Sequence, residues 1–135
     1  MAAKLNAYPV VVDAVVRQGD SYREAYVLKL DDGAAVRAVN LSGATLWLRV
    51  LDRPGGTCVL SAGELADWTC SGVMVTEAAA GRFVVWLTAA DTATVLGGGD
   101  LFYEVGVQFA ADDADLPSVV KTLLVGRLAV VADAA

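Results

Sequence analysis

Hydrophobic and polar residues alternate along most of this chain, which is the pattern of β-strands with one buried face. The segment SYREAYVLKL shows it clearly, with the apolar residues Tyr22, Tyr26, Leu28 and Leu30 in phase and the charged Arg23 and Lys29 out of phase. The same period occurs in ATLWLRVLD, GRFVVWLT and FYEVGVQFA. Shorter apolar runs, VVVDAVV, TCVL and VMVTE, are further candidate strands. No segment sustains the period of an amphipathic helix.

Turn-forming residues separate these runs and indicate the architecture. DDG at 31–33, RPGG at 53–56, AAAG at 78–81 and ADDADLP at 111–117 lie between candidate strands. Seven or eight strands with such turns predict an all-β fold, an antiparallel β-sandwich. We expect residues 10–135 to form this single domain and residues 1–9 to be an N-terminal arm. The last strand, in VVKTLLVGRLAVVAD, is expected to bend or bulge near Gly126.

The stretch LTAADTATVLGGGDLFYEV, between two of the candidate strands, predicts a corner where the chain crosses from one sheet to the other. Thr88 and Asp91 have the spacing of a capping box, so both side chains are expected to bind backbone donors of a short helix over residues 89–96. The glycines at 97–99, Gly99 among them, permit the positive φ angles that end the helix and reverse the chain. Tyr103 then has the position of a tyrosine corner, whose hydroxyl binds upstream backbone.

Composition removes several classes of chemistry. The chain has no histidine, which excludes Ser-His-Asp and Cys-His nucleophilic sites. Its two cysteines, Cys58 and Cys70, are too few for a structural zinc site, and reduced thiols or a disulfide are both open to them. No dinucleotide or phosphate-binding fingerprint is present, so no cofactor is expected.

Net charge and hydropathy restrict the classes of partner that the chain is expected to bind. A net charge of −6 without a Lys/Arg cluster argues against nucleic acid. No uncharged apolar run approaches the ~20 residues that cross a bilayer, so no membrane partner is expected either. A hydrophobic fraction of 56% is high for a monomer and indicates either surfaces covered by partner proteins or simply many alanines.

Carboxylates are the remaining reactive groups. Asp112, Asp113 and Asp115 share one loop and could hold calcium, although they lack the full EF-hand spacing and fit an ordinary solvated turn. Nothing identifies a facing carboxylate pair of the kind that glycoside hydrolysis needs. We therefore expect a protein that is not an enzyme.

The three tryptophans need a separate interpretation. Trp47 and Trp86 lie out of phase with the most apolar faces of their strands, which makes them candidate interface residues. Packing under a loop is the simpler explanation for these residues and for Trp68. Stacking on sugar rings is a third.

Several short motifs follow one another in a specific order over residues 16–133. A Gly19-Asp20 turn enters a strand, Leu41-Ser42-Gly43-Ala44 leads into another, and a glycine-led strand ends in Leu87-Thr88-Ala89. A short helix with Thr92, the triplet Tyr103-Glu104-Val105 and a last strand from Leu123 to Val130 complete the series. This order resembles that of small tail and baseplate structural proteins of double-stranded DNA bacteriophages.

The resemblance implies an immunoglobulin-like sandwich and a non-enzymatic role in the virion, which is assembled in the cytoplasm of the bacterial host. It places the chain in the tail or baseplate, with other virion proteins and copies of itself as partners. A capsid decoration protein is the nearest alternative, because it also acts by protein–protein contacts. A carbohydrate-binding module is the alternative of another class, and it requires coplanar, exposed aromatic rings.

Overall fold

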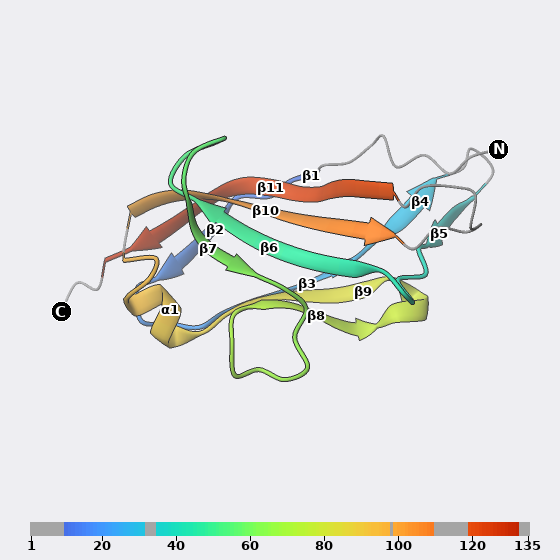
Figure 1. Cartoon of the computed structure of the whole chain (residues 1–135), viewed down its shortest axis with the longest axis horizontal. Coiled ribbons are helices and arrows are strands. Elements are labelled where there is room, and N and C mark those ends of the chain that lie inside the picture. Colours follow the sequence, from blue (N-terminus) through green and yellow to red (C-terminus); the bar gives the residue numbers. More distant parts are fainter. Residues whose placement is uncertain (1–9, 32–34, 98, 110–118, 133–135) are drawn as a thin grey trace.

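The computed structural model describes residues 10–31, 35–97, 99–109 and 119–132. It is an all-β sandwich, so the fold class predicted from the alternation is confirmed. Figure 1 shows two layers of strands lying one above the other, with a short helix at one end. The N-terminal arm predicted for residues 1–9 and the loop with Asp112, Asp113 and Asp115 lie outside the described residues.

The large sheet has six strand segments in the order β1–β11–β10–β6–β7, with β2 also paired to β11. They span Val10–Val11 (β1), Ala14–Arg17 (β2), Thr45–Leu51 (β6), Cys58–Ala62 (β7), Gly99–Phe109 (β10) and Val119–Val131 (β11). β1 and β2 run parallel to β11, whereas the other neighbours in the sheet are antiparallel. The first and last strands of the sandwich therefore lie side by side.

The small sheet has the order β3–β9–β8 and is antiparallel throughout. Its strands span Tyr22–Val27 (β3), Gly72–Glu77 (β8) and Arg82–Leu87 (β9). The remaining elements are a separate hairpin of Lys29–Asp31 (β4) and Val36–Ala38 (β5), a 3-10 turn (η2) at Ala78–Ala80, and the helix α1 at Ala89–Ala93.

The strand order is that of an immunoglobulin-like sandwich. In such folds the second, fifth and fourth strands form one sheet, and the third, sixth and seventh strands form the other. Here β3–β9–β8 faces β6–β10–β11, and β7 extends the large sheet. Counting β1 and β2 as one interrupted strand, eight strands make up the two sheets, which matches the seven or eight expected.

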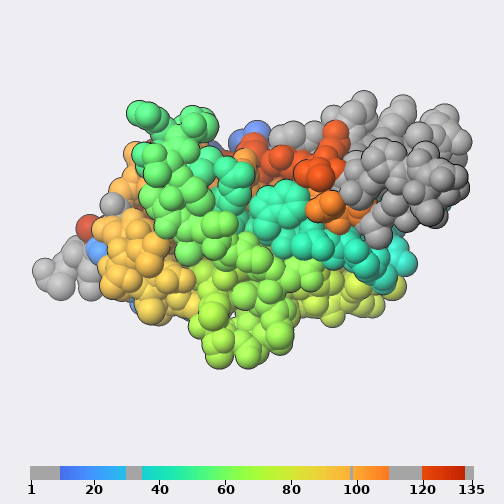
Figure 2. Space-filling model, viewed as in Figure 1, coloured from blue at the N-terminus to red at the C-terminus, as the bar shows by residue number. Residues whose placement is uncertain are grey.

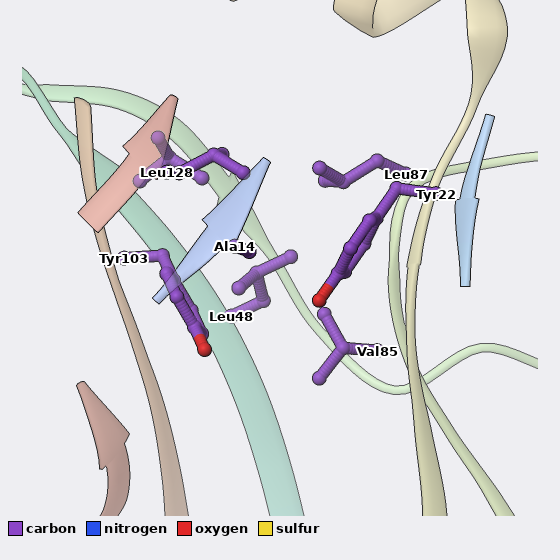
Figure 3. Close-up of a pocket in the computed structure, with 8 residues that line it drawn as sticks. Ala14, Tyr22, Leu48, Val85, Leu87, Tyr103 and Leu128 are labelled. Carbon is purple, nitrogen blue, oxygen red and sulfur yellow. The ribbon is translucent and has the colours of Figure 1, made fainter. Parts of the chain in front are cut away.

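The core lies between the sheets and follows the period-two pattern. Leu46, Leu48 and Val50 of β6 are almost completely buried against Phe83, Val85 and Leu87 of β9. Figure 3 shows Tyr22 and Tyr103 reaching into this space from opposite sheets, with both hydroxyls pointing the same way. The void between them is only about 10 Å³, so it is a packing defect and not a ligand site.

Two details differ from the sequence-based expectations. The last strand does not bulge at Gly126; its register shifts opposite the step from Val105 to Gly106, which leaves Leu123 as the extra residue. The shift lets both Leu123 and Leu124 enter the core, where they are 1% and 4% exposed. The helix expected over residues 89–96 ends at Ala93, before the β-branched Thr94 and Val95, which disfavour helix.

Candidate functional site

Trp47 of β6 lies on the outer face of the large sheet, and its indole ring packs on the neighbouring strand β10. It pairs in register with Gly106 of β10, and a Cβ at Gly106 would overlap the indole. The adjacent residues Leu46 and Leu48 point into the core. Because Gly106 has no side chain, the indole lies against the sheet, and Trp47 is half-buried without any partner protein.

Trp86 lies on the outer face of the small sheet, and the loop over residues 63–71 covers it. The indole Nε1 of Trp86 donates a hydrogen bond to the carbonyl of Trp68, 3.1 Å away. The two rings meet edge to face, with centroids 5.4 Å apart and an angle of 73° between their planes. Figure 1 shows this loop below the sandwich, between β7 and β8. The contact with Trp68 has no signal in the sequence, because nothing in the pattern places residue 68 over β9.

The two tryptophans singled out in the sequence do not come together. Trp47 belongs to the outer face of one sheet and Trp86 to the outer face of the other. One flat partner surface therefore cannot contact both. Their rings, together with that of Trp68, do not form a coplanar platform of the kind that stacks on a sugar.

The largest group of exposed apolar side chains lies elsewhere, on the large sheet. Nine large hydrophobic residues are exposed in the described part of the chain, and five of them, Val10, Val11, Val15, Val120 and Val131, are on β1, β2 and β11. All but Val10 point outward, since alternate residues of these strands, Ala14, Val16, Leu124, Leu128 and Val130, are buried. Outward-pointing Val125 is half-buried among them. We call the outer surface formed by Val11, Val15, Val120, Val125 and Val131 the valine face.

A groove of about 400 Å³ lies beside the valine face, under the turn between β6 and β7. Its apolar lining comes from Val11, Pro54, Phe102 and Val125, and its charged lining from Asp13, Glu104 and Arg127. Figure 2 shows that turn (green) projecting from one side of the molecule and the loop over residues 63–71 (yellow-green) projecting from the other. The volume is in the range of small-molecule pockets, but the groove is wide and open.

The charged groups around the groove bind one another. Arg49 Nε lies 3.2 Å from Glu104 Oε1, and Arg127 Nη2 lies 2.9 Å from Asp100 Oδ1. The carboxylate of Asp13 accepts a hydrogen bond of 3.0 Å from the backbone N–H of Arg127. Sequence reasoning missed this surface. Its signal was the predominance of valine and leucine in VVVDAVV and VVKTLLV, which leaves valines on both faces of a strand.

The corner residues hold the end of the sandwich. Thr88 caps α1, its hydroxyl accepting a hydrogen bond of 3.2 Å from the backbone N–H of Asp91. The Asp91 side chain does not bind the Thr88 backbone directly, as a capping box would. Instead the hydroxyl of Ser71 accepts from the Thr88 N–H, at 2.9 Å, and donates to Asp91 Oδ2. Gly97 and Gly99 have φ angles of +66° and +137°, and Gly98 lies outside the described residues.

Thr92 links the same helix to the turn before β3. Its side chain is fully buried, and its hydroxyl donates to the carbonyl of Asp20 at 2.7 Å and accepts from the N–H of Gly19 at 3.1 Å. The side-chain amide of Gln18 donates to the carbonyls of Ala93 and Gly97. These contacts join α1 and the residues after it to the turn before β3, so their role is structural.

Tyr103 binds the strand that precedes the first sheet crossing. Its hydroxyl donates to the carbonyl of Val12, in the break between β1 and β2. A Cβ at Gly126, the partner of Tyr103 in β11, would overlap that carbonyl. Gly126 thus leaves the room in which the Val12 carbonyl reaches Tyr103.

Burial raises the pKa of three tyrosine hydroxyls, those of Tyr22, Tyr26 and Tyr103, above the ordinary value of 10.0. Removal from water is the largest cause for each, and the negative charge of Glu24 adds to it. The Tyr26 hydroxyl is buried and, although close to the other two, makes no hydrogen bond of good geometry. These tyrosines are neutral at physiological pH and belong to the core.

The remaining candidate chemistry does not assemble into a site within the described residues. Cys58 and Cys70 are free, exposed thiols, so the reduced state is the one present. In the described ranges no three acidic or cysteine side chains come together as a metal site. None of the described helices is long and apolar enough to cross a membrane. No protein-family model matches the chain, and no curated protein sequence matches it significantly.

Proposed function

We propose that this chain is a non-enzymatic structural protein of a bacteriophage particle, in the tail or baseplate, and that it acts through contacts with other proteins. Two independent features support the proposal. One is the ordered series of motifs along residues 16–133, which resembles small tail and baseplate proteins. The other, and the observation that carries it, is the valine face, a set of exposed valines on the outer side of an otherwise well-packed domain.

The valine face has the properties of a protein contact surface. Val11 and Val15 are 70% and 68% exposed. They point outward from the same edge of the large sheet, opposite Val125 and Ala129 of β11, and Asp13 lies between them. Single exposed valines need no explanation, but several that point outward from one face of a sheet, beside a groove, are typical of a surface that another protein covers. The ion pairs Arg49–Glu104 and Arg127–Asp100 lie on the same outer face, which therefore combines apolar side chains with paired charges.

The tryptophans favour assembly over sugar binding. The ring of Trp86 meets that of Trp68 edge to face, and its N–H donates a hydrogen bond to the Trp68 carbonyl. Trp47 lies on the opposite side of the molecule. A sugar-binding platform needs rings that are parallel and on one surface. Each of the three tryptophan rings thus packs within the domain in a way that leaves no flat platform for a sugar.

The experiment that tests the proposal begins with particles produced by the strain that encodes the chain. We would purify them on a density gradient, identify the chain by mass spectrometry and locate a tagged copy by gold labelling in the electron microscope. Label on the tail or baseplate is expected. Label spread over the capsid would replace the tail assignment by a decoration role, and absence from all purified particles would overturn the proposal.

Charged substitutions test which tryptophan takes part in assembly. Trp47→Glu should keep the domain folded, because the side chain lies on the outer face, and should lower incorporation into particles if that face is in contact. Trp86→Glu removes the hydrogen bond to Trp68 and should release the loop over residues 63–71. Comparing each variant's melting temperature with its incorporation separates an assembly defect from a folding defect.

A further inference from the structure

The edges of the two sheets differ in whether a further strand could pair with them. The outer edge of β8 is already occupied, because Val73 makes backbone hydrogen bonds to Gly63 and Leu65. The edge formed by β1 and β2 is interrupted at residues 12–13, and β7 has a shift of register in its pairing with β6. Covers and interruptions of this kind keep strands of other chains from pairing at a sheet edge. β3 has neither, and its six residues pair with β9 in one unbroken register.

The hydrogen bonds around β9 show which residues of β3 bond to it. The N–H of Leu28 donates to the carbonyl of Gly81 at 2.8 Å, in continuation of the register between β3 and β9. On the other side of β9, Val73 directs its N–H and C=O to residues 63 and 65, which leaves the backbone of its partner Val85 for β3. Hydrogen-bonded pairs alternate along an antiparallel ladder. Both observations therefore make Glu24, the partner of Val85, a residue that bonds to β9.

The N–H and C=O groups of the alternate residues, Arg23, Ala25 and Val27, point away from β9 as a consequence. No strand of the described residues pairs with β3 on that side. The side chains of all three residues are exposed, on the outer face of the small sheet. A regular edge with unpaired backbone groups is a surface to which an extended strand can add through main-chain hydrogen bonds.

The side chain of Glu24 restricts which strand can be added. Its partner in β9 is the buried Val85, so Glu24 points to the inner face of the sheet, between Tyr22 and Tyr26. An apolar or acidic side chain added opposite Glu24 would enclose the carboxylate without a polar neighbour, which is costly. The added strand must therefore bring a side chain with a polar group to this position.

A second copy of β3 meets this condition in one antiparallel register. With Ala25 of the two copies opposite each other, Arg23 of each copy lies opposite Val27 of the other, and every free N–H and C=O of these residues gains a partner. Glu24 then lies beside the second copy's Tyr26, which carries a hydroxyl. Moving the two-fold axis to Glu24 would place two carboxylates directly opposite each other, and moving it to Tyr26 would leave Arg23 without a partner in β3.

We propose that two copies of this chain pair edge to edge through β3, antiparallel about a two-fold axis at Ala25. The three-stranded sheets of the two copies then join into one continuous sheet, in the order β8–β9–β3–β3–β9–β8. The proposal deepens the proposed function, because it names a copy of the chain as one assembly partner. It rests on that function only for the place of the pair in the particle.

Sedimentation of the purified full chain tests the pairing. The wild type should form a dimer whose share rises with concentration. Ala25→Pro removes the N–H at the axis but no bond to β9, so the domain should fold, and the dimer dissociation constant should rise about tenfold or more. Circular dichroism and thermal melting show whether each variant is folded.

A charged side chain at the axis gives a second test, which holds even if Ala25→Pro fails to fold. Ala25→Lys keeps the N–H but places two like charges opposite each other on the outer face, so it should weaken the dimer as well. Val36→Lys is the matched control, because Val36 is 63% exposed and lies on the separate hairpin. It should leave the dissociation constant unchanged.

Hydrogen exchange of the backbone amides, followed by NMR, identifies the strand that pairs. The N–H groups of Arg23, Ala25 and Val27 should exchange slowly where the chain is dimeric and faster after dilution. Their neighbours in β3, which bond to β9, should stay protected at both concentrations. A chain that is monomeric at every concentration, or a dimer in which these three amides exchange fast, would overturn the pairing. A dimer that neither Ala25 variant weakens would overturn it too.

The pairing and the proposed function fail in different experiments. A monomeric chain found in purified particles would remove the pairing and leave the virion role standing. A dimer that responds to the Ala25 variants, from a chain absent from all particles, would keep the pairing and remove the virion role.

Discussion

The hydroxyl of Tyr103 donates a hydrogen bond to the carbonyl of Val12, 2.5 Å away across 91 positions of sequence. The Val12 carbonyl belongs to the break between β1 and β2, where strand pairing with β11 is interrupted. The bond ties the N-terminal strand segments to the centre of the large sheet.

Tyr103→Phe should lower the free energy of unfolding by about 1–2 kcal/mol, because the partly buried Val12 carbonyl loses its donor. Tyr26→Phe is the matched control. The Tyr26 hydroxyl is buried without a partner, so its removal should leave stability unchanged or raise it. Urea denaturation followed by tryptophan fluorescence measures both. Equal losses from the two substitutions would show that the Tyr103 bond has no special weight.

Gly126→Ala should destabilise the domain by about 1–3 kcal/mol, since the new methyl group would overlap the backbone carbonyl of Val12 and push the first strand away. Gly63→Ala is the control, because a Cβ at Gly63 meets open space and the residue has no left-handed backbone. Thermal denaturation gives the melting temperatures of the two variants for comparison. A melting temperature for Gly126→Ala equal to that of Gly63→Ala would contradict the close approach.

Thr92→Val should cost about 1–3 kcal/mol of unfolding free energy. The substitution keeps the volume of the fully buried side chain but leaves the Gly19 N–H and the Asp20 carbonyl without their partner. Thr94→Val serves as its control, since the exposed Thr94 hydroxyl binds only the Ala90 carbonyl within the same helix. Chemical denaturation should show a loss for Thr92→Val alone, and a similar loss in both would refute the link between helix and turn.

Stability should fall as the pH rises above about 10. Unfolded tyrosines ionise near pH ~10, whereas burial holds the pKa of Tyr22, Tyr26 and Tyr103 higher in the folded domain. Below pH 10 these tyrosines are neutral in both states and the stabilisation is complete. Above pH 10 the unfolded state loses protons first, which lowers its free energy relative to the folded state. Absorbance at alkaline pH should show these three tyrosines ionising together with unfolding. Ionisation near pH 10 in a still folded domain would contradict their burial.

The sequence predicted the strands of the core well because their period is unambiguous. β6 and β10 alternate over most of their length, and their in-phase residues, such as Leu48 and Val105, are nearly inaccessible to solvent. Thr88 was also predictable as a helix cap, since the hydrogen bond depends on residues only three positions apart. Local geometry of this kind is encoded in spacing alone.

Contacts between distant segments were not predictable in the same way. Asp91 was expected to bind the Thr88 backbone, but Ser71, 17 positions before Thr88, stands between them. The cover that Trp68 provides for Trp86 depends likewise on how a long loop folds over a sheet. Gly126 was interpreted as a bulge, whereas its role is to make room for Val12. In each case the missing information was which backbone passes close by.

The parallel pairing of β1 and β2 with β11 has a consequence for biosynthesis. Ala14 is paired with Leu128, so this sheet edge cannot form until the last strand has left the ribosome. An incomplete nascent chain therefore lacks the surface on which Val15 and Val131 stand together. This edge of the large sheet is therefore complete only in a finished molecule, whose last strand has already been synthesised.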